Sequence, residues 1–161
     1  MRRSIIFALA VFCLLAAPAQ ATDWPQSGMR EYAANLPFRT VLERLENAVE
    51  ANGMSIVARA CATAGAKSLG VEIPGNALIM VFRADFALRM LKASLPAGIE
   101  APLRFYLTED PVNGRTTLTY RLASHVFAPY GSPELDAMAA ELDPIFAAIA
   151  AQTIPTEPAT E

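Results

Sequence analysis

Two alternating segments joined by a tight turn constrain the fold of this chain most strongly. In residues 102–108 (PLRFYLT), apolar and polar side chains alternate, and the same pattern returns in residues 116–122 (TTLTYRL). Between them lies the predicted turn EDPVNGR (109–115), whose Asn113-Gly114 dipeptide is a strong hairpin signal. Strict alternation indicates strands with one buried face. The pattern therefore predicts an antiparallel hairpin as part of the sheet.

Two long amphipathic segments predict the helices that cover this sheet. In residues 37–53, apolar side chains recur every three or four positions, with Pro37 in the first turn and Gly53 just past the end. The second segment starts at Ser132-Pro133, which suit the N-cap and first helical positions. Pro144 lies inside its apolar stripe, so we expect a kink or break there.

The remaining segments complete an α+β fold. We expect strands over 29–35, 54–61 and 76–82, a short helix over 62–70, and a helix from Asp85, as N-cap, to Pro96. Residues 76–82 are apolar at nearly every position, which favours a central strand covered on both faces. The expected order is β-α-β(4)-α, with two main helices packed on one face of a curved, largely antiparallel sheet.

The N-terminal residues resemble a secretory signal. Arg2 and Arg3 precede an apolar run, and Ala19-Gln20-Ala21 matches a cleavage site. The run is shorter than the roughly 20 residues that span a membrane. We therefore expect a signal peptide over 1–21 cleaved after Ala21, a leader over 22–28, a single domain over 29–152, and a disordered tail over 153–161. The mature protein is expected in the periplasm or secreted, without a stable membrane anchor.

Composition argues against nucleic acid as a partner. The net charge is −3, and the basic residues are scattered rather than clustered. Of the two cysteines, Cys13 lies in the predicted signal peptide, which leaves Cys61 without an intrachain partner. The fold is expected to depend on its hydrophobic core.

Few residues are candidates for catalysis or metal binding. His125 is the only histidine, and with Cys61 it is too little for a zinc site, so no metal and no cofactor are expected. We interpret His125 as a partly packed residue at the end of a strand or in a loop. Cys61 precedes the predicted short helix, whose N-terminus would lower a thiol pKa. It is either a reactive thiol or a small buried residue.

A carboxylate pair is the third chemical alternative. Glu100 lies before the predicted strand 102–108, and Glu109 and Asp110 flank the hairpin turn. A hydrolase would need Glu100 to converge with one of the other two in a single cleft. No catalytic residue is predicted unless they converge.

The order of these segments resembles that of the domain-of-unknown-function 302 family. The resemblance rests on FRTVLERLENAVEANGMSIVARA, GVEIPGNALIMVF, IEAPLRFYLTED and TLTYRL, and it extends from Met29 to about Gln152. It implies a β-α-β4-α architecture like that of the TATA-binding-protein group, with a cavity between helix and sheet, and a homodimer. It implies no activity. Where the family often has Asp-His after the second strand, this chain has Cys61-Ala62.

These patterns favour a non-catalytic binding or accessory protein that holds a small apolar ligand or a protein partner. The alternative is a thiol-dependent role of Cys61 in redox chemistry or in an intermolecular disulfide. The predicted pocket lining is apolar or lies at strand ends; it comprises Phe82, Leu88, Leu91, Phe105, Tyr106 and Tyr120. Each of these residues could instead simply fill the core.

Overall fold

One antiparallel sheet of five strands forms the frame of the molecule. The computed structural model describes residues 26–155. The strands lie in the order β1-β5-β4-β3-β2, and every neighbouring pair is antiparallel. The strands are β1 (Met29–Ala34), β2 (Ser55–Ala60), β3 (Asn76–Phe82), β4 (Leu103–Glu109) and β5 (Thr116–Arg121). The predicted hairpin is β4–β5, and the predicted α+β class is confirmed.

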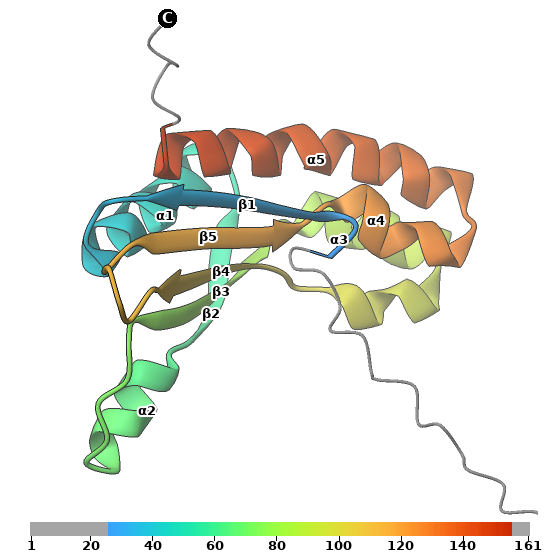
Figure 1. Cartoon of the computed structure of the whole chain (residues 1–161). Coiled ribbons are helices and arrows are strands. Elements are labelled where there is room, and N and C mark those ends of the chain that lie inside the picture. The colour runs from blue at the N-terminus through green and yellow to red at the C-terminus, as the bar shows by residue number, and fades with distance from the viewer. Residues whose placement is uncertain (1–25, 156–161) are drawn as a thin grey trace, which may run out of the picture.

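Helices cover one face of this sheet, as the sequence predicts. The long helices α1 and α5 pack against each other on that face, and the opposite face carries no helix layer (Figure 1). The seven residues of α2 protrude from the β2–β3 end of the sheet (Figure 1). The helical elements are α1 (Phe38–Ala51), α2 (Ala62–Ser68), α3 (Ala84–Ala93), η1 (Leu95–Glu100), α4 (Ala123–Phe127), η2 (Ala128–Tyr130) and α5 (Pro133–Thr153).

The core lies between the sheet and this helix layer. Phe105 of β4 is fully buried and stacks on Phe146 of α5, with 4.7 Å between the ring centroids. Tyr120 of β5 lies against both rings, and Val41 and Leu45 of α1 are fully buried in the same cluster. Alternate residues of β3 and β4 therefore face the helices, and the others form the open face.

Helix α5 begins where the sequence predicts and continues further than expected. The Ser132 hydroxyl accepts a hydrogen bond from the Leu135 backbone N–H, which is an N-cap contact. The helix runs through Pro144 without a break, so the alternative of a break there is wrong. Thr153, the first residue of the predicted tail, is the last residue of α5 and is buried.

Three local predictions are corrected by tertiary packing. Helix α3 starts at Ala84 after Arg83, and Asp85 lies in its first turn, where its carboxylate binds the Arg83 guanidinium. Strand β3 is covered on one face only, because Ala77, Ile79 and Val81 are buried and the alternate residues are half-exposed. The alternation predicted for β2 is interrupted by an irregularity between Ile56 and Ala58.

The predicted signal peptide, most of the leader, and the tail from residue 156 lie outside the described residues. Among residues 26–155, no helix is both long enough and apolar enough to cross a membrane.

Candidate functional site

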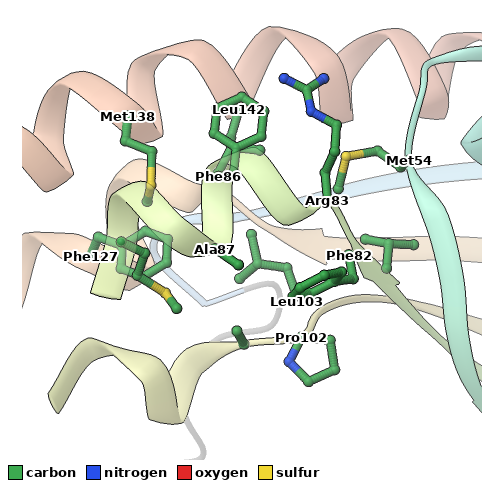
Figure 2. A pocket seen from close by; sticks show the side chains of 13 residues that line it. Met54, Phe82, Arg83, Phe86, Ala87, Pro102, Leu103, Phe127, Met138 and Leu142 are labelled. Atoms are coloured by element: carbon green, nitrogen blue, oxygen red, sulfur yellow. The ribbon is translucent and has the colours of Figure 1, made fainter. Parts of the chain in front are cut away.

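The space between helices and sheet is nearly filled. A cavity of about 40 Å³ remains beneath α3, where side chains from α3, α5 and the start of β4 converge (Figure 2). Ligand pockets for drug-sized molecules have volumes of roughly 300–1,000 Å³. The interior cavity is therefore too small for an apolar ligand of that size.

A larger concavity lies on the open face of the sheet, at the end where β4 starts and β5 ends. Its volume is about 500 Å³. We call it the open-face concavity; its lining residues are Met29, Leu78, Glu100, Leu103, Arg104, Tyr106, Thr119, Arg121, His125, Val126 and Pro129. A second hollow of about 340 Å³ adjoins it and shares Tyr106 and Thr119.

Strand pairing sets the floor of this concavity. Tyr106 of β4 is paired with Leu78 of β3 on one side and with Thr119 of β5 on the other. The Tyr106 hydroxyl accepts a hydrogen bond from the Asn76 side-chain amide, which fixes the ring over the sheet. The floor is therefore built on rigid elements, which hold a binding site more precisely than loops do.

His125 forms part of the wall and is held there by a glycine. It lies in α4, directly after β5, and its side chain is exposed. The imidazole lies so close to Gly28 that an added Cβ there would come within 2.0 Å of its Cγ. Gly28 has φ +79° and its carbonyl accepts a hydrogen bond from the Leu122 N–H, which ties the chain before β1 to the end of β5. Only glycine allows both the close approach of the imidazole and the positive φ angle at low energetic cost.

A larger hollow, of about 780 Å³, lies beside the end of β1. It is lined by the end of β1 and the residues after it, by Arg44 and Arg115, and by Ile154 and Pro155. The open-face concavity is instead built on paired residues of three neighbouring strands, Leu78, Tyr106 and Thr119, and we take it as the candidate site.

The six predicted pocket residues do not come together. Phe105 and Tyr120 lie in the core, Tyr106 lines the open-face concavity, and Phe82 lines the small interior cavity. Leu88 and Leu91 are exposed on α3, where Phe86 and Met90 form the buried stripe instead. Burial raises the pKa of Tyr120, with a smaller contribution from its hydrogen bond with Tyr32, so this phenol stays protonated.

The three carboxylates proposed for hydrolysis serve local structure. Glu100 accepts a hydrogen bond from the Tyr130 hydroxyl at 3.0 Å. Glu109 accepts one from the Gly75 N–H at 2.8 Å, and Asp110 accepts one from the Val112 N–H in the turn. Strand β4 separates Glu100 from the other two by about 20 Å, at roughly 3.4 Å per residue. They share no cleft.

Cys61 lies at the N-cap of α2, exposed and without a disulfide. Its side chain makes no cap hydrogen bond. Within residues 26–155, no group of three or more His, Cys, Asp or Glu side chains is arranged to hold a metal ion.

Arg104 and Arg121 line the concavity but were not predicted as site residues. Both stand at polar positions in the two alternating segments that predict the hairpin. Residues at alternate positions of paired strands share a face, so the hairpin register was the signal that could have brought them together.

These features define an α+β protein with a helix-covered antiparallel sheet and a concave open face. The family described as "Domain of unknown function DUF302" matches residues 30–152, and the chain belongs to this family. The fold is similar to that in the crystal structure of an uncharacterized conserved DUF302 protein from Bacillus stearothermophilus. That similarity has a TM-score of 0.70 at 18% identity and covers 79% of this chain and 98% of that chain. No curated protein matches the chain.

Proposed function

We propose that this chain is a non-catalytic binding protein whose ligand occupies the open-face concavity. The observation that carries the proposal is the contrast in volume, about 500 Å³ on the open face against about 40 Å³ under the helices. A small organic molecule fits the first and not the second. The site of the apolar ligand expected between helix and sheet therefore moves to the other face.

The apolar character of β3 supports this choice. Leu78 and Met80 alternate with the buried residues of β3 and point to the open face, yet no helix of the described chain covers them. Apolar residues on an uncovered sheet face favour an occupant that removes them from water. Leu78 belongs to the lining of the open-face concavity and would contact that occupant directly.

We also propose a periplasmic or secreted location and a homodimer, each on a separate observation. The signal-peptide pattern of residues 1–21 supports a periplasmic or secreted protein. A homodimer is supported by large apolar side chains left exposed on α3 and η1, two elements that contact each other; Leu88, Leu95 and Ile99 are 71%, 75% and 82% exposed. Exposed apolar side chains gathered on one region of a surface often mark an interface between proteins.

A thiol-dependent role is the second candidate, and the exposure of Cys61 favours it. In an oxidising compartment an exposed single thiol can form a disulfide between two chains. Non-reducing electrophoresis of protein isolated without reductant tests this role. A dimer band that disappears in Cys61→Ser would support it, and a monomer band in the wild type would exclude the intermolecular disulfide.

Native mass spectrometry tests the binding function. Protein isolated from its source cells under gentle conditions should carry a small adduct, which Leu78→Trp should remove because the larger indole would occupy the part of the concavity where the ligand contacts Leu78. Leu69→Trp is the matched control, since Leu69 lies at the end of α2 and is 82% exposed. Wild-type protein without an adduct, or an adduct that survives Leu78→Trp, would contradict the proposal.

A further inference from the structure

Two arginines lie side by side in the lining of the open-face concavity. The register that pairs Phe105 with Tyr120 brings Arg104 and Arg121 to adjacent positions on β4 and β5, just beyond the last paired residues. Both arginines line the concavity. Like charges at facing positions of neighbouring strands destabilise a sheet. The fold therefore places two arginines at neighbouring positions on one face of the sheet, an arrangement of like charges that does not favour the sheet itself.

Neither concavity arginine forms a salt bridge with another residue of the range 26–155. The salt bridges within that range involve Arg39, Arg59, Arg83 and Arg89. Arg121 reaches only the Gln26 side-chain oxygen, at 3.5 Å. Glu100 is the acidic residue in the lining, and its carboxylate accepts a hydrogen bond from the Tyr130 hydroxyl rather than a salt bridge from an arginine.

The net charge of the lining selects a particular kind of head group. Among the Arg, Lys, Asp and Glu residues of the lining, two arginines and one glutamate leave a single positive charge. A head with one negative charge balances it, and guanidinium groups bind carboxylates through paired hydrogen bonds. The His125 ring, fixed over Gly28, adds a hydrogen-bond donor or acceptor at the same wall.

The rest of the lining is apolar. Leu78, Leu103, Val126 and Pro129 contribute carbon surface, and the half-buried Tyr106 ring lies on the floor. Such surface would cover the hydrocarbon part of a ligand whose charged end lies near the arginines.

We propose that the open-face concavity recognises a small amphipathic carboxylate. Its carboxylate lies between Arg104 and Arg121, and its apolar body lies against Leu78, Leu103 and Val126. This inference rests on the proposed function and adds the chemical class of the ligand.

Isothermal titration calorimetry with three probes of equal chain length tests the inference: octanoate, octan-1-ol and octylammonium. Octanoate should bind at least about tenfold more tightly than octan-1-ol, and octylammonium should not bind detectably, because a charge-assisted hydrogen bond contributes about that factor. Arg104→Gln and Arg121→Gln should each weaken octanoate binding about tenfold or more. Arg39→Gln is the matched control, since its exposed guanidinium lies on α1.

The stability of the free protein shows whether the two arginines serve ligand binding or the fold. If the two arginines serve the ligand, replacing either should leave the urea midpoint of the free protein unchanged or raise it, because a repulsion is removed. A lower midpoint together with unchanged octanoate affinity would mean that they serve the fold, and would overturn the inference.

The other outcomes distinguish the two proposals. Equal binding of octanoate and octan-1-ol, both abolished by Leu78→Trp, would overturn the carboxylate inference and retain the binding function. No binding of octanoate would overturn the inference, and the native mass spectrum would then decide the binding function independently. Binding of inorganic phosphate in preference to octanoate would assign the arginines to a phosphate group instead.

Discussion

Replacing Gly28 with alanine should move His125 out of the wall of the open-face concavity. The added Cβ would lie 2.0 Å from the His125 Cγ, so the ring must leave its place. The backbone at φ +79° adds a cost of roughly 1–2 kcal/mol for a residue with a side chain. Forcing the ring away from its rotamer adds on the order of 0.5–1.5 kcal/mol. These costs sum to about 1.5–3.5 kcal/mol, and the stiffer unfolded chain of the variant offsets about 0.4–1 kcal/mol, so we expect Gly28→Ala to lower the free energy of unfolding by roughly 1–3 kcal/mol.

Urea denaturation of four variants separates the two contributions. Gly53→Ala is the matched control, since Gly53 has φ +71° and nothing within 4 Å of an added Cβ. It should cost about 1 kcal/mol, the backbone contribution less the gain from a stiffer unfolded chain. His125→Ala removes the obstacle, so adding Gly28→Ala to it should cost only about as much as Gly53→Ala. If Gly28→Ala alone costs no more than Gly53→Ala, the imidazole is not held by Gly28 and the reasoning fails.

Three further predictions concern other parts of the molecule. Ser132→Ala removes the hydroxyl that accepts the Leu135 N–H at 3.4 Å and should lower the free energy of unfolding by about 1 kcal/mol, measured by urea denaturation; an unchanged midpoint would exclude a working cap. The hydrogen bond from Arg89 lowers the pKa of Glu141, so its stabilisation is present above the carboxyl's unfolded pKa and lost as pH falls through the lower folded value. The difference in thermal midpoint between wild type and Glu141→Gln should therefore vanish in acid, and a difference that persists there would contradict the pair. Cys61 should react fully with an alkylating reagent in the native state, as followed by mass spectrometry; labelling only after denaturation would mean that it is covered.

The elements that the sequence predicts well are those whose pattern is local. Apolar and polar residues alternate in residues 102–108 and 116–122, so the sequence alone predicts which face of β4 and β5 is buried. Helix α1 and the start of α5 are predicted equally well, because their apolar stripes and end signals lie within each segment.

The misassigned residues depend on contacts that the chain makes at a distance. Helix α3 carries two overlapping apolar stripes, and the packing of α3 against α5 selects Phe86 and Met90 over Leu88 and Leu91. The apolar run of β3 indicates burial on both faces, yet a sequence cannot say whether a helix layer or an outside occupant covers the second face.

The candidate site escaped prediction for the same reason. Its wall joins Gly28 to His125, which are far apart in sequence and meet only because β1 pairs with β5. In the sequence, Arg104 and Arg121 resemble ordinary solvent-facing residues. Only the register of β4 against β5 shows that they occupy neighbouring positions.

The most direct test of the account maps where a carboxylate binds. Backbone amide chemical shifts recorded during an octanoate titration report the position of the ligand on the folded protein. We predict that the largest changes fall at Tyr106, Thr119 and Arg121, on the open face of the sheet. Changes concentrated instead at Phe86 and Met90, which line the interior cavity, would place the ligand between helix and sheet and contradict the account.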